Sequence, residues 1–212
     1  MQWMTEHEYS ILGGFSRAKV GRILGSVAAA ASSLLTFLLL TLVDVAKRFG
    51  ITANVPPIIF SIVGAATMWA LLYLLFNRFV WRWRWVSRAL KSPDVGGTYW
   101  VNGQTLNGDG TVKYAWEGSL AINQSWDRIR VRLRTSSSTS YSIAAALFFD
   151  PSDGYRLLYH YRNEPLMGSP ELTGHRGFAD ILFSDGLDSA EGEYFNGQGR
   201  FTFGRLTLAK DA

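Results

Sequence analysis

The sequence predicts two transmembrane α-helices followed by an all-β domain, folded as an eight-stranded antiparallel up-and-down β-barrel. Three observations lead to this fold class. Residues 23–43 and 55–76 are uncharged over 21 and 22 residues, and residues 78–85 then combine three tryptophans with three arginines. From residue 94 onward, short alternating segments separated by glycine and aspartate replace the long apolar runs. The chain therefore divides into a membrane half and a folded half.

Positive charge is concentrated in the membrane half. Residues 1–93 hold ten Lys and Arg residues against three acidic residues, whereas residues 94–212 hold eleven against fourteen. A nucleic-acid-binding domain carries its basic residues in the folded part, so we expect neither DNA nor RNA as a partner. The chain has no cysteine, which excludes a disulfide framework and fits a reducing compartment.

Each uncharged run is long enough to cross a bilayer. At about 1.5 Å per residue, a helix of this length matches the roughly 30 Å hydrocarbon core. Pro56 and Pro57 lie where the start of a helix tolerates proline. The first run exceeds the apolar region of a signal peptide, and no Ala-x-Ala cleavage site follows it. We therefore expect a transmembrane hairpin over residues 23–76, surrounded by lipid.

The flanking charges predict the orientation of this hairpin. Three basic residues precede residue 23, two lie in the short connection, and five lie in a juxtamembrane neck at residues 77–93. The positive-inside rule then places both termini in the cytoplasm. Residues 1–22 are expected to form a short cytoplasmic segment at the membrane surface. The four-residue spacing of Trp81 and Trp85 predicts that the second helix continues into the neck.

Small residues recur along the first apolar run at Gly25, Ala29 and Ser33. Such a pattern lets helices approach closely within lipid. Two interpretations stay open: the seam packs the first helix on the second, or it joins neighbouring protomers.

The β-domain at residues 94–212 contains eight strand candidates, rich in aromatic and β-branched residues and separated by turn signals. Residues 128–134 alternate strictly between arginine and an aliphatic residue, which is typical of a half-buried strand. Closure into a barrel would remove exposed edges and could enclose one small ligand. The candidates are Thr98–Gly103, Val112–Asn123, Arg128–Thr135, Tyr141–Phe149, Tyr155–Arg162, Phe178–Ser184, Glu191–Phe195 and Arg200–Ala209.

Four arginines are expected beside the rim of the barrel that lies farther from the membrane: Arg134, Arg162, Arg176 and Arg200. Guanidinium groups converging on an open mouth favour an anionic ligand, because arginine matches phosphate in a bidentate fashion. The alternative is that these arginines are scattered and only keep the surface soluble.

Five aromatic residues could line the barrel interior and stack on a flat base: Trp100, Tyr114, Trp116, Tyr159 and Tyr161. The alternative is that these rings fill the core of a small barrel. With Ile129, Val131 and Leu133 inward, Arg130 and Arg132 would point to solvent or to another protomer.

No catalytic or metal-binding constellation is evident in the sequence. His7, His160 and His175 lack metal-ligand spacing, and neither a Gly-x-Ser-x-Gly elbow nor a phosphate-binding loop occurs. We therefore expect a protein that is not an enzyme and that needs neither a metal nor a cofactor.

The order of two spans, the Arg/Trp neck, Gly96-Gly97-Thr98-Tyr99-Trp100 and the later strands resembles a known family over nearly the whole chain. It is similar to the two-transmembrane, β-strand-rich effectors of bacterial CBASS antiphage systems. The Gly-x-Tyr-Trp opening also resembles lipocalin- and avidin-like barrels.

The resemblance implies a sensor in the bacterial inner membrane. Its barrel would bind a cyclic dinucleotide or a related cyclic oligonucleotide, protomers would form a homo-oligomer, and the helices would disrupt the membrane in abortive infection. Two other classes stay open: a membrane-tethered carrier of an apolar ligand such as lipid or haem, and a structural module that docks proteins.

Overall fold

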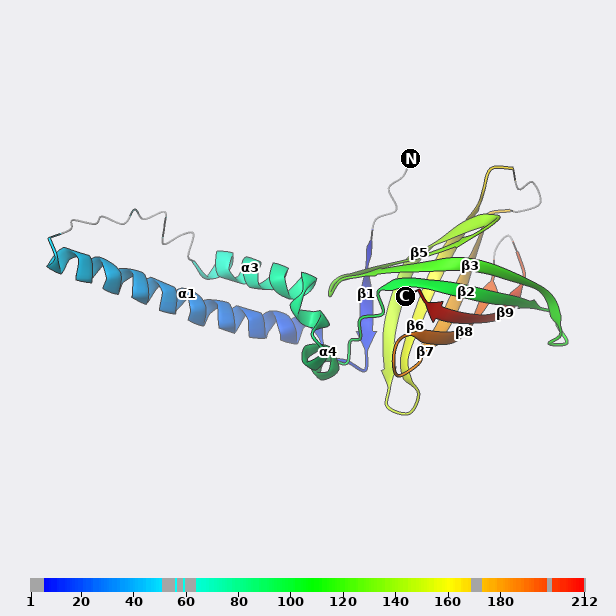
Figure 1. The fold of residues 1–212 in the computed structure, drawn as a ribbon, viewed down its shortest axis with the longest axis horizontal. Coiled ribbons are helices and arrows are strands. Elements are labelled where there is room, and N and C mark those ends of the chain that lie inside the picture. Colours follow the sequence, from blue (N-terminus) through cyan, green and yellow to red (C-terminus); the bar gives the residue numbers. More distant parts are fainter. Residues whose placement is uncertain are drawn as a thin grey trace. The chain divides into compact units, whose positions relative to one another are not determined.

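The computed structural model describes residues 6–50, 56, 59, 64–168, 173–197 and 200–211. These residues form two compact units, a helical unit at Phe15–Trp83 and a β-rich unit that combines Met1–Gly14 with Arg84–Ala212 (Figure 1). The division falls inside the predicted neck, between Trp83 and Arg84.

The helical unit contains helix α1 (Arg17–Arg48), helix α3 (Ala65–Arg78) and the short 3-10 helix η1 (Val80–Arg82). The side chain of Ser16 caps α1 by accepting a hydrogen bond from the backbone N–H of Lys19. Lys47 and Arg48 lie in its last turn, where they stabilise the negative end of the helix dipole.

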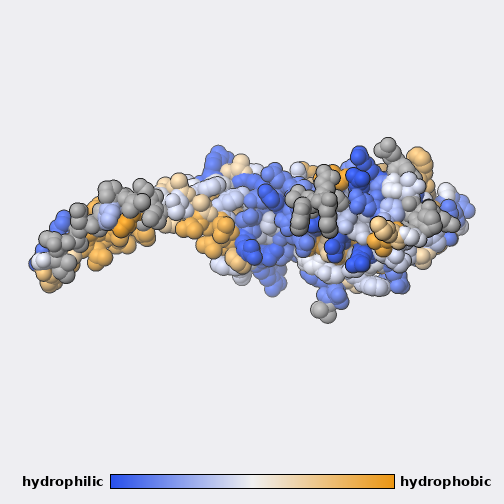
Figure 2. Space-filling view, turned by 90° about the horizontal axis from the view of Figure 1, so that it is seen from above, coloured by the Kyte–Doolittle hydropathy of each residue, from blue (hydrophilic) through white to orange (hydrophobic). Residues whose placement is uncertain are grey.

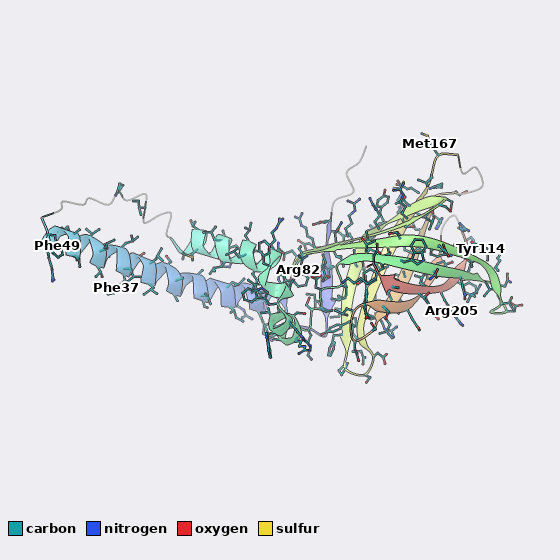
Figure 3. The ribbon with its side chains drawn as sticks, in the orientation of Figure 1. Phe37, Phe49, Arg82, Tyr114, Met167 and Arg205 are labelled. Atoms are coloured by element: carbon teal, nitrogen blue, oxygen red, sulfur yellow. The ribbon has the colours of Figure 1, made fainter. Side chains whose placement is uncertain are left out.

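Helix α1 is the one described helix that is long and apolar enough to cross a membrane. Its surface exposes large apolar side chains along its length, including Phe37 and Leu42 at 64% and 66% exposure (Figures 2 and 3). The predicted first span, 23–43, therefore lies within a longer helix. The predicted second span is 55–76. Most residues of its first part, 55–63, lie outside the described residues, and α3 covers the remainder of the span.

Helices α1 and α3 pack at the small residues near the start of α1. The indole N–H of Trp69 donates to the carbonyl of Gly21 at 3.4 Å, and Gly25 lies beside the same ring. The buried positions of α1 are Val20, Ala28 and Ser32, whereas Ala29 and Ser33 stay exposed. Among the described residues, the Gly25 end of the predicted seam therefore serves packing of one helix on the other, whereas Ala29 and Ser33 do not.

The predicted continuous helix through the neck is wrong. Helix α3 ends at Arg78, η1 follows, and helix α4 (Arg84–Leu90) starts after Trp83 adopts an extended backbone. The phenylalanine at position 79 leaves the helical conformation, with φ −129° and ψ −54°. Trp81 and Trp85 consequently lie on separate helical segments.

The β-rich unit is a closed sheet of nine strands in the order β1-β4-β3-β2-β9-β8-β7-β6-β5 (Figure 1). All eight predicted strands are present, with ends that differ by a few residues. They are β2 (Gly97–Leu106), β3 (Val112–Gln124), β4 (Arg128–Thr135), β5 (Ser138–Asp150), β6 (Gly154–Pro165), β7 (His175–Phe183), β8 (Ser189–Asn196) and β9 (Phe203–Lys210).

The predicted strand number of eight is wrong, because strand β1 (His7–Leu12) joins the sheet from the N-terminal segment expected at the membrane surface. Strands β4 and β5 pair directly only over Arg132–Arg134 and then diverge. Strand β1 fills the gap, antiparallel to β4 at His7 and Glu8 and parallel to β5 from Tyr9 onward. Without β1, the backbone N–H and C=O groups of β4 and β5 would lack hydrogen-bond partners in the sheet where the two strands diverge.

Tyr9 fixes β1 in the barrel. Its side chain is 3% exposed, its hydroxyl donates to the carbonyl of Ser125 at 3.2 Å, and Gln124 Nε2 donates to that hydroxyl at 3.1 Å. His7 Nε2 lies 2.7 Å from the hydroxyl oxygen of Ser142 on β5. The strand is therefore held by side chains as well as by its backbone.

A dense core fills one end of the barrel. Inward residues of the alternating strands meet there, and fully burying such a side chain stabilises the fold by about 1.5–3 kcal/mol. The largest of them are Tyr99, Val101, Leu120, Ile122, Ile129, Val131, Leu147, Leu157 and Ile181. The hydroxyl of Tyr99 donates to the carbonyls of Val95 and Leu187. This packing leaves room for a ligand only toward the opposite end.

Candidate functional site

A pocket of about 300 Å³ occupies the opposite end of the barrel. That volume lies at the lower limit of small-molecule sites. Strands β2, β4, β6 and β8 end there, so the pocket opens at the rim that the sequence predicted for ligand entry. Its walls include Thr105, Tyr114, Trp116, Leu133, Thr135, Ser138, Ser140, Tyr159, Tyr161, Asn163, His175, Ala179, Tyr194, Asn196, Arg200 and Leu206.

Tyr194 organises one wall of the pocket. Its hydroxyl shares a hydrogen bond of 2.7 Å with Thr105 Oγ1 and accepts one of 3.2 Å from the indole N–H of Trp116. The two rings meet edge to face, with centroids 5.8 Å apart. Trp116 lies across Gly103 of the neighbouring strand, where a side chain would collide with the indole. The ring is therefore held in place for stacking.

Tyr161 organises a neighbouring part of the wall in a similar way. Its hydroxyl donates to Asn196 Oδ1 at 2.7 Å, and the amide of Asn196 donates to Thr202 Oγ1 at 2.7 Å. The ring lies across Gly177, its partner on β7, where an added Cβ would come 2.5 Å from the ring. Burial raises the pKa of Tyr159, Tyr161 and Tyr194, so these phenols stay neutral at physiological pH.

Asn163 supplies a buried polar group beside these rings. It is 6% exposed, and its Nδ2 donates to the hydroxyls of Ser138 and Ser140 at 2.9 Å each. Its Oδ1 has no hydrogen-bond partner among the described residues. An unpaired buried acceptor costs about 1–3 kcal/mol, so this wall favours a ligand that brings a donor.

Arg200 brings positive charge to the mouth. Its guanidinium donates a hydrogen bond to the hydroxyl of Tyr114, which reaches over from β3. Burial and, to a smaller extent, the Arg200 charge lower the pKa of His175, so that this imidazole is neutral near pH 7.

The structure brings together five of the nine residues predicted for ligand binding: Tyr114, Trp116, Tyr159, Tyr161 and Arg200. The other four lie outside the pocket. Trp100 is 50% exposed on the outer face of β2, because its neighbours Tyr99 and Val101 take the inward positions.

The remaining three predicted residues, Arg134, Arg162 and Arg176, also point outward. Leu133, Tyr161 and His175 precede them on their strands and line the pocket, and successive side chains of a strand alternate between faces. Arg162 instead forms an exposed ion pair with Glu164 at 3.5 Å. The prediction that four guanidiniums converge on the mouth is therefore wrong, and Arg200 is the one of the four that lies there.

The sequence interpretation missed the polar part of the pocket. Thr105, Asn163, His175, Tyr194 and Asn196 each occupy an inward position near a strand end. Strand alternation counted from the aliphatic core outward would have identified them. Tyr194 follows Ala190 inward on β8 at a spacing of four, and Asn163 follows Tyr159 and Tyr161 on β6.

The arrangement is suited to holding a polar, partly aromatic anion. Aromatic rings provide flat surfaces, the guanidinium attracts negative charge, and buried amides fix orientation. In the part of the chain that the structure describes, no cluster of three or more His, Asp or Glu side chains could hold a metal ion.

Comparisons with known proteins agree with the division into a helical part and a β-rich part. Residues 18–82 match the family model described as Cap15, TM helices, and residues 90–210 match the one described as Cap15, cyclic dinucleotide receptor domain. The chain is 40% identical over 207 residues to CD-NTase-associated protein 15 from Yersinia aleksiciae, and the match covers 98% of both proteins.

Proposed function

Because this chain belongs to the Cap15 family of CBASS membrane effectors, we propose that its pocket binds a cyclic dinucleotide or a related cyclic oligonucleotide. The pocket lies wholly within the residues that match the cyclic dinucleotide receptor domain. The function is that of a receptor, in which binding changes assembly and no bond of the ligand is broken.

One observation carries the proposal: Arg200 lies at the mouth of a pocket whose walls are aromatic and hold a buried amide oxygen, Asn163 Oδ1, without a hydrogen-bond partner among the described residues. A cyclic dinucleotide offers anionic phosphates, flat bases and base N–H donors, which match these three features in turn. The amides, hydroxyls and guanidinium of the lining argue against a carrier of lipid, and the presence of a pocket argues against a purely structural barrel.

Helix α1 supports membrane anchoring, and the family match over residues 18–82 supports a second span. We propose spans at 23–43 and 55–76, with both termini on the cytoplasmic side of the bacterial inner membrane, since ten basic residues flank or connect the spans and eight of them lie outside the connection. Residues 77–93 form the neck. The sensor comprises residues 94–212 together with β1, which the structure adds to it.

The ligand acts on the membrane through assembly. A ligand shifts such an equilibrium only to the extent that it binds the assembled state better than the resting state. Protomers gathered by ligand would bring their α1 helices together, disrupt the inner membrane and kill the infected cell. This series of events is the abortive-infection response of an antiphage system.

Calorimetric titration of the full chain in detergent with a panel of cyclic di- and trinucleotides tests the binding. At least one member should bind, whereas the corresponding linear mononucleotides should bind at least tenfold more weakly, a difference of about 1.4 kcal/mol. The same chain in dye-loaded vesicles should release dye only when the bound nucleotide is present. Absence of binding to every member would exclude the receptor function, and binding without dye release would exclude membrane disruption.

A further inference from the structure

A row of aromatic side chains crosses the outer surface of the barrel near the pocket end. Phe178 on β7 stands opposite Phe195 on β8, which stands opposite Phe203 on β9. Phe178 and Phe195 stack with centroids 5.7 Å apart, yet Phe195 stays 56% exposed and Phe203 44% exposed. Contiguous exposed apolar groups rimmed by polar residues mark interaction surfaces.

Two carboxylates continue this surface along β8. Glu191 and Glu193 point outward with Phe195 and are exposed. Across the neighbouring strands Glu191 faces Leu182 and Thr207, whereas Glu193 faces Asp180 and Arg205. Glu191, Glu193, Phe178, Phe195 and Phe203 are called the Phe/Glu face below.

Three arginines adjoin the Phe/Glu face. Arg156 is paired with Asp180 at 2.9 Å, Arg205 projects from β9 (Figure 3), and Arg176 lies outward at the start of β7. None of these three arginines stands directly opposite Glu191 in the sheet, and Arg156 already pairs with Asp180. The carboxylate of Glu191 is thus available to a cation from outside the barrel.

A stripe of guanidiniums lies on β4. Arg130, Arg132 and Arg134 share its outer face at every second position, and they are called the arginine face. On β3 they stand opposite Asn123, Ala121 and Ser119, so no carboxylate is directly opposite there. On β5, Arg132 and Arg134 stand opposite Tyr141 and Thr139. Like charges this close repel one another, and no carboxylate stands directly opposite Arg132 or Arg134 on β3 or β5. Arg130 lies over the ring of Tyr141 at 5.4 Å, and Glu8 on β1 stands opposite Arg128, the preceding arginine of the strand.

The two faces lie on opposite sides of the barrel. In the closed strand order, β3, β2 and β9 separate β4 from β8 on one path, and β1, β5, β6 and β7 separate them on the other. A guanidinium pairs with carboxylates and also binds over aromatic rings, so the Phe/Glu face offers partners to Arg132 and Arg134, and these offer a cation to Glu191.

We propose that the arginine face of one barrel docks on the Phe/Glu face of a second copy of this chain. Because the faces differ and lie on opposite sides, the contact is heterologous, and each added copy presents both faces again. Copies therefore line up head to tail in an open row or a ring.

The pocket connects directly to one of these faces. Phe195 and Phe203 flank the loop that carries Arg200, and Asn196 at its base binds both Tyr161 of the pocket wall and Thr202 of the loop. A ligand that engages Arg200 or Tyr161 would therefore act on described residues that lie between Phe195 and Phe203, among them Asn196 and Thr202. The role of the ligand in this inference rests on the proposed function, whereas the two docking surfaces do not depend on it.

The absence of cysteine from the chain allows a direct test by cross-linking. Full-length Arg132→Cys and Glu193→Cys chains are placed in vesicles, separately and mixed, and treated with a short bis-maleimide with and without a bound cyclic dinucleotide. The mixture should give a cross-linked pair, each variant alone should give almost none, and a chain with both substitutions should give a ladder. Asn102→Cys, exposed on β2 between the two faces, should not cross-link to either.

Charge reversal provides a second test in the full chain. Arg132→Glu should weaken self-association by about tenfold or more, and Glu191→Arg should do the same, since Glu191 has Thr207 and Leu182 rather than an arginine opposite it in the sheet. The mixture of the two variants should regain assembly, because each then meets its complement. All these positions are exposed, so thermal midpoints should stay at the wild-type value.

The outcomes separate the inference from the proposed function. A chain that binds cyclic dinucleotide and assembles, but gives no 132-to-193 product and no rescue in the mixture, overturns the docking proposal and leaves the receptor intact. Self-cross-linking of either single variant would show a two-fold contact and also overturn it. A chain that gives the 132-to-193 product but binds no nucleotide keeps the docking surfaces and overturns the receptor. A chain that never self-associates overturns the docking proposal.

Discussion

The indole of Trp116 lies across Gly103, its partner on the neighbouring strand, so that no side chain fits at position 103. This contact fixes the position of the pocket wall, because the N–H of the same indole donates a hydrogen bond to the Tyr194 hydroxyl. A glycine that is not itself part of the pocket lining thus holds the largest ring of the pocket in position.

Gly103→Ala should push the Trp116 ring toward the pocket. We expect a loss of about 1–3 kcal/mol in the free energy of unfolding and weaker ligand binding. Chemical denaturation and calorimetric titration measure the two effects. Gly108→Ala is the matched control, because its Cβ meets no atom within 4 Å. Equal behaviour of the two variants would contradict the proposed role of Gly103.

Tyr194→Phe should destabilise the barrel through the partners it leaves behind. Thr105 Oγ1 and the Trp116 N–H would both lose the tyrosine hydroxyl, at a cost of about 1–3 kcal/mol for each buried group. Adding Thr105→Val should recover part of this loss, since it removes one of the stranded groups. Additive losses in the double variant, measured by denaturation, would show that Thr105 and Tyr194 are not coupled.

The pKa of His175 predicts a loss of stability in mild acid. Its folded-state pKa lies below the ordinary value of 6.5, chiefly because of burial. Below pH 6.5 the unfolded chain therefore takes up a proton that the folded chain resists, which favours unfolding until the pH passes the folded pKa. Above that window the imidazole is neutral in both states and contributes no pH dependence.

Thermal unfolding of the wild type and of His175→Gln across this pH range measures the effect. The wild-type midpoint should fall more steeply below pH 6.5 than the midpoint of the variant, which has no imidazole at this position. Parallel curves would mean that His175 titrates alike in both states.

Because β1 is part of the closed sheet, we expect the sensor to need the N-terminal segment for its stability. Tyr9→Ala removes a ring that is 3% exposed and should cost about 3–5 kcal/mol, in the range of other buried aromatic truncations. Glu8→Ala, outward and exposed on the same strand, should change the free energy of unfolding by no more than about 0.5 kcal/mol. Denaturation of both variants in the full chain compares them directly, and similar stabilities would show that β1 does not close the barrel.

The strands were predictable because their signal is local. Alternation within residues 128–134 reveals a half-buried strand without knowledge of its partners, and β4 has the predicted ends. Strand β1 was not predictable in this way. Its six residues pair with segments more than a hundred residues away in sequence, and only the divergence of β4 from β5 creates a place for it.

Five of the nine predicted site residues line the pocket. The others point outward for one physical reason, the alternation of side chains along a strand. Tyr161 and Arg162 are adjacent in one strand and cannot both face the interior, yet both were assigned to the ligand. The same alternation separates Leu133 from Arg134 and His175 from Arg176. Arg200 escapes the rule because it lies in the loop before β9, where its direction depends on contacts that sequence does not reveal.

The affinity of the full chain for its cyclic nucleotide, compared between arginine variants, tests the central claim most directly. Arg200→Ala should weaken binding at least tenfold, about 1.4 kcal/mol, because it removes the cation at the mouth. Arg134→Ala, Arg162→Ala and Arg176→Ala should bind like the wild type, since these side chains lie outside the pocket. Unchanged affinity in Arg200→Ala, or a comparable loss in the outward variants, would contradict ligand binding inside this barrel.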